Sequence, residues 1–475
     1  MNPKMFGQRV VRVAAVAAVV GLSASVGAGT AGADRPPPIV PGLMPDGPPM
    51  GPKDETEQAS NTPCASTQTG GDGPTVPDAQ RALGIDKAWQ FSRGAGQLVA
   101  VIDTGVAPNP RLPDLIAGGD YVSHTDGTED CDAHGTFVAG IIAASQVPGQ
   151  GFAGVAPDAR ILSIRQSSSL FQVKGRSLQK APDEMPDAYG STTTLAWAVR
   201  HAVDMHATVI NMSLTACKAV SEPFEDRALG AAVQYAAEHD VVVVAAAGNT
   251  DKECKNAKNP VFDPLDPTAD PWSKIDYNVS PARYDDYVLS VGSVDSNGQA
   301  SKFTVPGPWL GVAAPGENLI SLDPHFNDAQ SKGTATAKVD AQGRAEPITG
   351  TSFASPYVAG LAALVRSRFP ELSAPEVVKR IEATAHAPAE GWNPYIGYGI
   401  IDPLAALTDQ VPAQLPPKAQ HPVKSVQLSV PATPPTPDHT ARNVALIGSA
   451  VIAIMCILGL LASFPLRRRF QTRDK

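Results

Sequence analysis

Cysteine and positive charge are both scarce in this sequence. Five cysteines among 475 residues are too few for a disulfide-rich scaffold, and they match no zinc-finger spacing. The chain has 38 Lys and Arg against 47 Asp and Glu, and its body contains no basic cluster, which argues against a nucleic-acid-binding protein. Disorder throughout the chain is also excluded, since 43% of the residues are hydrophobic.

The N-terminus has the pattern of a secretory signal peptide. Three basic residues precede a short apolar run: Lys4, Arg9 and Arg12, then residues 13–22. Small residues at 31–33 suit cleavage before Asp34, so we predict a signal peptide over residues 1–33. The alternative is an uncleaved anchor helix, but the apolar run is short for a membrane span.

A second apolar segment lies near the C-terminus. Residues 444–464 carry no charge, and at about 1.5 Å per residue a helix there would cover roughly 31 Å, one hydrocarbon core. Three arginines follow, at 467–469, and basic residues mark the cytoplasmic side. We predict a transmembrane helix over 444–464, a cytoplasmic tail over 465–475 and a body outside the cytoplasm. A buried core helix is the alternative.

The cysteines fit an oxidising compartment. Cys456 lies in the predicted membrane segment, which leaves an even number on the exported side, Cys64, Cys131, Cys217 and Cys254. Three pairings are possible, and we favour Cys64–Cys131 with Cys217–Cys254. Four free thiols are the alternative.

Proline divides the exported part of the chain. Residues 34–78 form a Pro/Gly-rich extension, in which eight prolines lie within residues 34–52, and residues 409–443 form a Pro-rich linker. Between them we predict one domain over residues 79–408.

Strand-like and helix-like runs alternate through this domain. The apolar, β-branched runs are residues 98–103, 161–164, 208–211, 241–245 and 288–291. The helix-like stretches are residues 134–145, 192–206, 225–239 and 352–368. This alternation predicts a three-layer α/β domain with a mostly parallel sheet. Polar segments at 166–190, 251–280 and 322–347 are predicted to be surface insertions.

Two polar residues stand at positions suited to catalysis in such a sheet. Asp103 ends the first buried strand and precedes a Gly turn, the edge where open α/β sheets bind ligands. His134 opens an apolar helix rich in small residues, His134-Gly-Thr-Phe-Val-Ala-Gly140. Taken alone, the Asp could be a turn or cap residue, and the His could be a helix cap.

A serine and an asparagine are further candidates for catalytic residues. Ser352, in Gly350-Thr-Ser-Phe-Ala-Ser-Pro356, lies in the first turn of a helix, where free N–H groups can receive an oxyanion. Asn249 follows the apolar run Val241–Ala245 and could donate to that oxyanion. An N-cap Ser and a turn Asn are the structural alternatives.

Together, in the order Asp, His, Asn, Ser, these motifs resemble those of subtilases, the subtilisin-like serine proteases, over roughly residues 80–405. The resemblance implies a subtilisin-like fold and endopeptidase activity that needs no cofactor. It implies that Ser352 is the nucleophile, His134 the general base and acid, and Asp103 its orienting carboxylate, with Asn249 and the Ser352 N–H at the oxyanion. Residues Ser213, Leu214 and Thr215 resemble the segment that binds substrate backbone and walls the S1 pocket. Thr215 stands where Gly is usual, which predicts a narrower pocket.

The arrangement of the whole chain resembles a narrower group, the mycosins, which are membrane-anchored subtilases of mycobacterial type VII secretion. Three further stretches support this: Ala88-Trp-Gln-Phe-Ser-Arg-Gly94, Asp130-Cys-Asp-Ala-His134 and Pro308-Trp-Leu-Gly-Val-Ala-Ala-Pro-Gly316. The resemblance implies residence in the inner membrane, association with the secretion membrane complex and cleavage of exported protein substrates. The alternative function is that of a structural component of that complex, with proteolysis secondary.

Secreted subtilases usually carry a folded inhibitory prodomain, which a segment so rich in proline as residues 34–63 could hardly form. We therefore predict that the extension is retained and wraps the body, held near His134 by Cys64–Cys131. Many subtilases also bind Ca²⁺, and Asp263, Asp266 and Asp270 share one loop. Since such residues are more often solvated turn residues, we predict no metal.

Overall fold

The computed structural model describes residues 35–45, 51–60, 62–175, 189–259, 270–326, 333–340, 343–411 and 439–470. The chain divides into two compact units, Met1–Val423 and Lys424–Lys475. The predicted signal peptide, most of the predicted linker and the last five residues of the basic tail lie outside the described residues.

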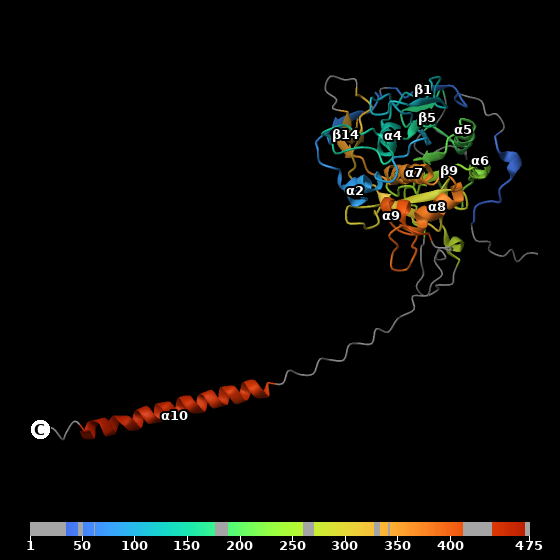
Figure 1. Cartoon of the computed structure of the whole chain (residues 1–475). Helices are drawn as coiled ribbons and strands as arrows, with labels where there is room; N and C mark the ends of the chain where they lie inside the picture. The colour runs from blue at the N-terminus through green and yellow to red at the C-terminus, as the bar shows by residue number, and fades with distance from the viewer. Residues whose placement is uncertain are drawn as a thin grey trace, which may run out of the picture. The chain divides into compact units, whose positions relative to one another are not determined.

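A parallel sheet of seven strands forms the centre of the first unit (Figure 1). Its spatial order is β12-β11-β9-β7-β3-β5-β4, and every neighbouring pair is parallel. The strands are β3 (Leu98–Asp103), β4 (Ile116–Asp120), β5 (Arg160–Arg165), β7 (Val209–Met212), β9 (Val242–Ala246), β11 (Leu289–Val294) and β12 (Leu310–Pro315). The five predicted apolar runs all fall on strands of this sheet.

Helices cover both faces of the sheet, which confirms the predicted three layers. Alternate side chains of a strand point to opposite faces; on β3, Val99 and Val101 join one core, and Ala100 and Ile102 join the other. The first core includes α4 (His134–Ala143), α7 (Thr351–Arg368) and α8 (Ala374–Ala383). The second includes α5 (Thr192–Asp204) and α6 (Arg227–Glu238), which pack against each other.

Short elements complete this unit. The helices are α2 (Asp78–Ala82), α3 (Ile85–Ala88), α9 (Pro403–Thr408) and the 3₁₀ turns η1 (Pro41–Leu43) and η2 (Pro271–Lys274). The remaining strands are β1 (Thr56–Gln58), β2 (Ser66–Thr69), β6 (Phe171–Val173), β8 (Ala216–Ala219), β10 (Tyr277–Ser280), β13 (Ser321–Leu322), β14 (Thr334–Val339) and β15 (Ala345–Pro347). The polar segments predicted as insertions therefore carry strands of their own.

The Pro-rich extension pairs with these outer strands. Strand β1 is antiparallel to β6, and β2 is antiparallel to β14. Ile39 packs against the second core, and the Arg200 Nη1 group donates to the Pro45 carbonyl at 3.1 Å. The extension thus lies along the body over its described residues, as predicted, but it does so partly by adding β-strands.

The second unit contains one long helix, α10 (Thr440–Phe470). Its segment Thr440–Ala462 contains an 18-residue window with a mean hydropathy of 2.8 and is long and apolar enough to cross a membrane. The predicted transmembrane segment, 444–464, lies within α10. No other helix among the described residues meets both conditions.

Candidate active site

Three neighbouring strands bring some of the predicted site residues to one edge of the sheet. Asp103 is the last residue of β3, the segment Ser213–Thr215 follows β7, and Asn249 follows β9. Because these strands are parallel and adjacent, their carboxyl ends share one edge, where ligands bind in open α/β sheets.

The Asp103 carboxylate contacts the His134 ring directly. Asp103 Oδ1 accepts hydrogen bonds from His134 Nδ1 at 2.6 Å and from the Thr104 N–H at 2.8 Å. The Asp103 side chain is fully buried, whereas His134 is 25% exposed, toward the cleft. Burial disfavours the charged imidazolium, but the charge and hydrogen bond of Asp103 outweigh it, so the pKa of His134 is raised. A carboxylate in this position fixes the ring with Nδ1 protonated and Nε2 free.

A buried polar network that the sequence analysis missed holds the start of α4 against β3. Thr104 Oγ1 accepts from the Gly135 N–H at 2.9 Å and donates to Asp130 Oδ1 at 2.8 Å. Asp130 Oδ2 accepts from both the N–H and the hydroxyl of Thr136. Burial raises the pKa of Asp130 to about 6. Asp130 and Thr104 therefore accept hydrogen bonds from the first N–H groups of α4. His134 is not needed as a cap of this helix, and its ring contacts Asp103 instead.

Ser352 is the second residue of α7, and the N-cap position of this helix is Gly350, so Ser352 is not an N-cap residue. Its carbonyl accepts from the Ser213 hydroxyl at 2.6 Å, which ties the start of α7 to the segment after β7. Ser352 and His134 line the same cleft, and Phe353 places its ring 4.8 Å from the His134 ring. Among the described residues no direct hydrogen bond joins the Ser352 hydroxyl to the His134 ring. Such bonds are often long in unliganded sites and tighten when substrate binds.

Asn249 is held on both sides of its amide. Its Oδ1 accepts from the Thr351 N–H at 2.8 Å, and its Nδ2 donates to Glu253 Oε1 at 2.8 Å. A Cβ placed on Gly350 would lie 3.7 Å from Asn249 Nδ2 and 3.1 Å from Ser352 Oγ, so the amide and the hydroxyl approach the same point. Neither Thr351 nor Glu253 was identified from the sequence, although Thr351 belongs to the motif around Ser352.

The segment Ser213–Thr215 lines the same cleft. The Thr215 hydroxyl faces the Ala246 carbonyl at 3.5 Å, and its Cγ2 would lie 3.2 Å from a Cβ placed on Gly248. The Thr215 side chain therefore fills space between the segments that follow β7 and β9.

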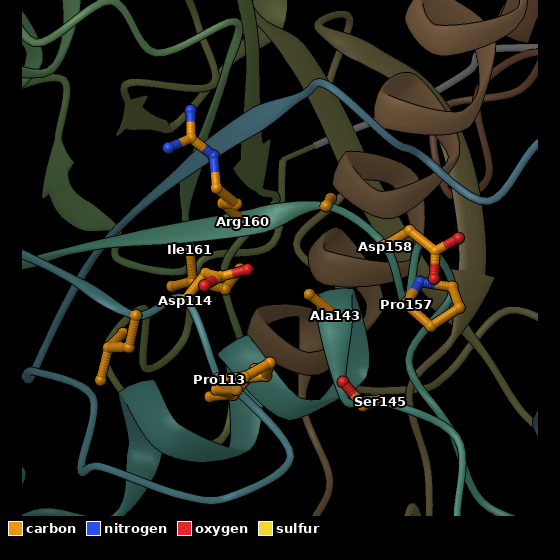
Figure 2. A pocket seen from close by; sticks show the side chains of 11 residues that line it. Pro113, Asp114, Ala143, Ser145, Pro157, Asp158, Arg160 and Ile161 are labelled. Carbon is orange, nitrogen blue, oxygen red and sulfur yellow. The ribbon is translucent and has the colours of Figure 1, made fainter.

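The cleft has a volume of about 720 Å³ and contains every residue predicted for catalysis except the fully buried Asp103. A much smaller hollow, of about 50 Å³, is lined by Asp114, Ala143, Arg160 and their neighbours (Figure 2). It lies beside the last residue of α4 and the first of β5, at the opposite end of α4 from His134.

The structure joins the cysteines in the pairs that the sequence analysis favours, Cys64 with Cys131 and Cys217 with Cys254. Of the Asp residues considered for Ca²⁺, 263 and 266 lie outside the described residues. Asp270 pairs with Arg35 at 2.9 Å and accepts from the Trp272 N–H. In the described part of the chain no three His, Cys, Asp or Glu side chains are grouped so as to hold a metal ion.

A family profile, curated proteins and solved structures were compared with this chain, and all three match proteins of one family. The profile of the subtilase family matches residues 94–399. Mycosin-4 of Mycobacterium tuberculosis (strain ATCC 25618 / H37Rv) is 43% identical over 98% of this chain and 97% of its own length. The solved structure of the MycP3 protease from the type VII (ESX-3) secretion system is 46% identical, with a TM-score of 0.72 over 79% of this chain and all of its own. A chain of an intact ESX-5 inner membrane complex is 40% identical, with a TM-score of 0.73 over 90% of this chain and 99% of its own.

Proposed function

The chain belongs to the subtilase family and, within it, to the mycosins; on this premise we propose that Asp103, His134 and Ser352 are the catalytic triad of this serine endopeptidase. The observation that carries the proposal is the 2.6 Å hydrogen bond between Asp103 and His134 at the cleft that also contains Ser352 and Asn249.

In the proposed mechanism the same groups act in both halves of the reaction, the formation of the acyl-enzyme and its hydrolysis. His134 Nε2 takes the proton of Ser352 as Oγ attacks the scissile carbonyl, and Asp103 stabilises the imidazolium that forms. The Ser352 N–H and Asn249 Nδ2 hold the oxyanion, assisted by the positive end of the α7 dipole. His134 then protonates the leaving amine. Water hydrolyses the acyl-enzyme by the same steps.

Substrate selection is proposed to depend on Ser213, Leu214 and Thr215. Backbone groups of this segment would pair with an extended substrate, and the Thr215 side chain would shorten the S1 pocket. This favours small residues at the position before the scissile bond.

The place of action is inferred from the ends of the chain and from the ESX-5 comparison. We infer a single-pass inner-membrane protein with α10 in the bilayer, the catalytic unit outside the cytoplasm and the C-terminus inside. The two disulfides also support a location outside the cytoplasm, because disulfides form and persist in oxidising compartments. By likeness to a chain of the ESX-5 inner membrane complex, this chain would associate with a type VII secretion membrane complex and cleave exported proteins.

Labelling of the purified full-length chain with a fluorophosphonate tests the enzymatic proposal. The probe should modify wild-type protein at Ser352 and leave Ser352→Ala unmodified. A folded wild-type protein that is not labelled, or that is labelled elsewhere, would contradict the triad.

A second function, as a structural component of the secretion complex, is favoured by that same similarity to a chain solved within a membrane complex. Secretion in a Ser352→Ala strain and in a deletion strain separates the two functions. Survival of secretion in the first strain and its loss in the second would favour the structural role. Comparison of the secreted proteins of wild-type and Ser352→Ala strains would identify the cleaved substrates.

A further inference from the structure

Glu253 lies beside the amide of Asn249, in the turn between Asn249 and Cys254. Glu253 Oε1 accepts two hydrogen bonds from Asn249, one from its backbone N–H and one from Nδ2, both at 2.8 Å. Glu253 also lines the cleft. None of the catalytic steps above uses this carboxylate.

The turn that carries Glu253 is held at both ends. The N–H groups of Lys252 and Cys254 both donate to the Asn249 carbonyl, at 3.2 Å and 3.1 Å. Cys254 is bonded to Cys217 on β8, directly after the segment that lines the cleft. The carboxylate therefore projects from a short, cross-linked turn.

The hydrogen bonds of Asn249 determine which way its amide faces. The Thr351 N–H and hydroxyl both donate to Oδ1, so this atom is the oxygen, and the atom facing Glu253 is the nitrogen. An Asn side chain otherwise rotates broadly about its last torsion. One N–H of Nδ2 is held by Glu253, and no second acceptor for Nδ2 lies in the described part of the chain, which leaves the other N–H for a ligand in the cleft.

Glu253 uses one oxygen, Oε1, to accept from both the backbone and the side chain of Asn249. Burial raises the pKa of the Glu253 carboxyl, while the hydrogen bonds from Asn249 and the charge of Lys252 oppose the shift. A carboxyl oxygen keeps its acceptor capacity in either protonation state, so the hydrogen bond from Asn249 Nδ2 does not depend on the charge of Glu253. The contact can therefore restrain the amide firmly in a site that substrate enters and leaves.

We propose that Glu253 is a positioning residue of the oxyanion site, which holds Asn249 Nδ2 in the orientation that donates to the oxyanion. The proposal rests on the oxyanion role proposed above for Asn249. In this proposal Glu253 acts on the reaction through Asn249 and makes no bond to the reacting atoms.

The rate of Ser352 phosphonylation by a fluorophosphonate tests this on the full-length protein. In that reaction the Ser352 Oγ–P bond forms, the P–F bond breaks, fluoride leaves and His134 takes the Ser proton. The phosphoryl oxygen occupies the oxyanion site. Asn249→Ala should lower the maximal rate of labelling by about 10²–10³-fold. Glu253→Ala should lower it by about 10-fold with the probe affinity unchanged, because loss of positioning weakens a donor without removing it.

The double variant discriminates a positioning role from a merely structural one. Asn249→Ala with Glu253→Ala should label at the rate of Asn249→Ala alone, since Glu253 has then no amide to hold. Glu253→Gln keeps an acceptor oxygen and should label within about 3-fold of wild type. Lys255→Ala, a change at an exposed residue directly after this turn, is the matched control.

Each outcome bears on one proposal. A normal rate for Asn249→Ala would overturn the oxyanion assignment itself. A slow Asn249→Ala with a normal Glu253→Ala, or two effects that multiply in the double variant, would overturn only the role of Glu253. If Glu253→Ala does not fold, Glu253→Asp provides the measurement: it keeps the charge but is one methylene shorter, and a rate equal to wild type would contradict the proposal.

Discussion

Asp103 Oδ1 and His134 Nδ1 are 2.6 Å apart, although 31 residues separate them in the chain. The contact joins the end of a central β-strand to the first residue of a helix on one face of the sheet. Asp103 is fully buried, so its charge acts on the ring with little screening by solvent.

Replacing Asp103 by Asn should lower the rate of peptide hydrolysis by about 10⁴-fold while the protein still folds. The neutral amide stabilises the imidazolium poorly and no longer fixes the productive tautomer. Asp126→Asn, in an exposed turn, is the matched control and should keep the wild-type rate. Equal rates for the two variants would contradict the role assigned to Asp103.

The pH dependence of labelling should reflect the raised pKa of His134. Only the neutral ring accepts the Ser352 proton, so activity should be lost as the pH falls through a value above about 6.5, the ordinary histidine pKa. The charge of Lys338 lowers the pKa of His134. Lys338→Gln should therefore move the acid limb to higher pH, and Lys338→Arg should leave it in place. A shift to lower pH would contradict this electrostatic arrangement.

Gly135 is required for the close approach of α4 to β3. A Cβ at this position would lie 2.0 Å from the Gly105 carbonyl oxygen and 3.2 Å from Asp103 Cβ. Gly135→Ala should reduce the free energy of unfolding by about 1–3 kcal/mol, as overpacking does, and should reduce activity as His134 is displaced. Gly73→Ala, where a Cβ meets no atom within 4 Å, is the control for chemical denaturation and labelling.

The S1 pocket should widen when the Thr215 side chain is removed. Thr215→Gly is expected to raise kcat/KM for peptides with an aromatic residue before the scissile bond by about 10-fold or more, with little change for alanine. Thr215→Val, which keeps the shape of the side chain, should retain the wild-type preference. An unchanged preference in Thr215→Gly would show that another group limits the pocket.

The extension should remain attached to the mature protein. Strands β1 and β2 pair with strands of the body, and Cys64 is bonded to Cys131, so removal would expose two strand edges and an apolar contact at Ile39. Intact-mass measurement of the purified chain should place its first residue at or near Asp34. A first residue near 80 would refute retention.

Much of the fold follows from local pattern. The apolar run ending at Asp103 predicts a strand, and the small apolar residues after His134 predict a helix; both are found with bounds within a few residues. Periodicity and helix signals depend on neighbours in the chain, so they can be read without coordinates. The placement of the Pro-rich extension could not be predicted in this way. Its prolines predict an extended chain, but they do not specify which strands of the body it pairs with.

The chain order of the Asp, His, Asn and Ser motifs, the strands and helices that carry them and the apolar helix near the C-terminus could all be predicted from the residues alone. The tertiary structure alone decided that Glu253 holds Asn249, that Asp130 caps the helix of His134 and that β2 adds to β14. The physical reason is that these contacts join segments brought together by strand order and packing. The sequence shows that a polar side chain is present but not which hydrogen-bond partner it will have. Only the folded structure shows which donors and acceptors lie within hydrogen-bond distance of each other.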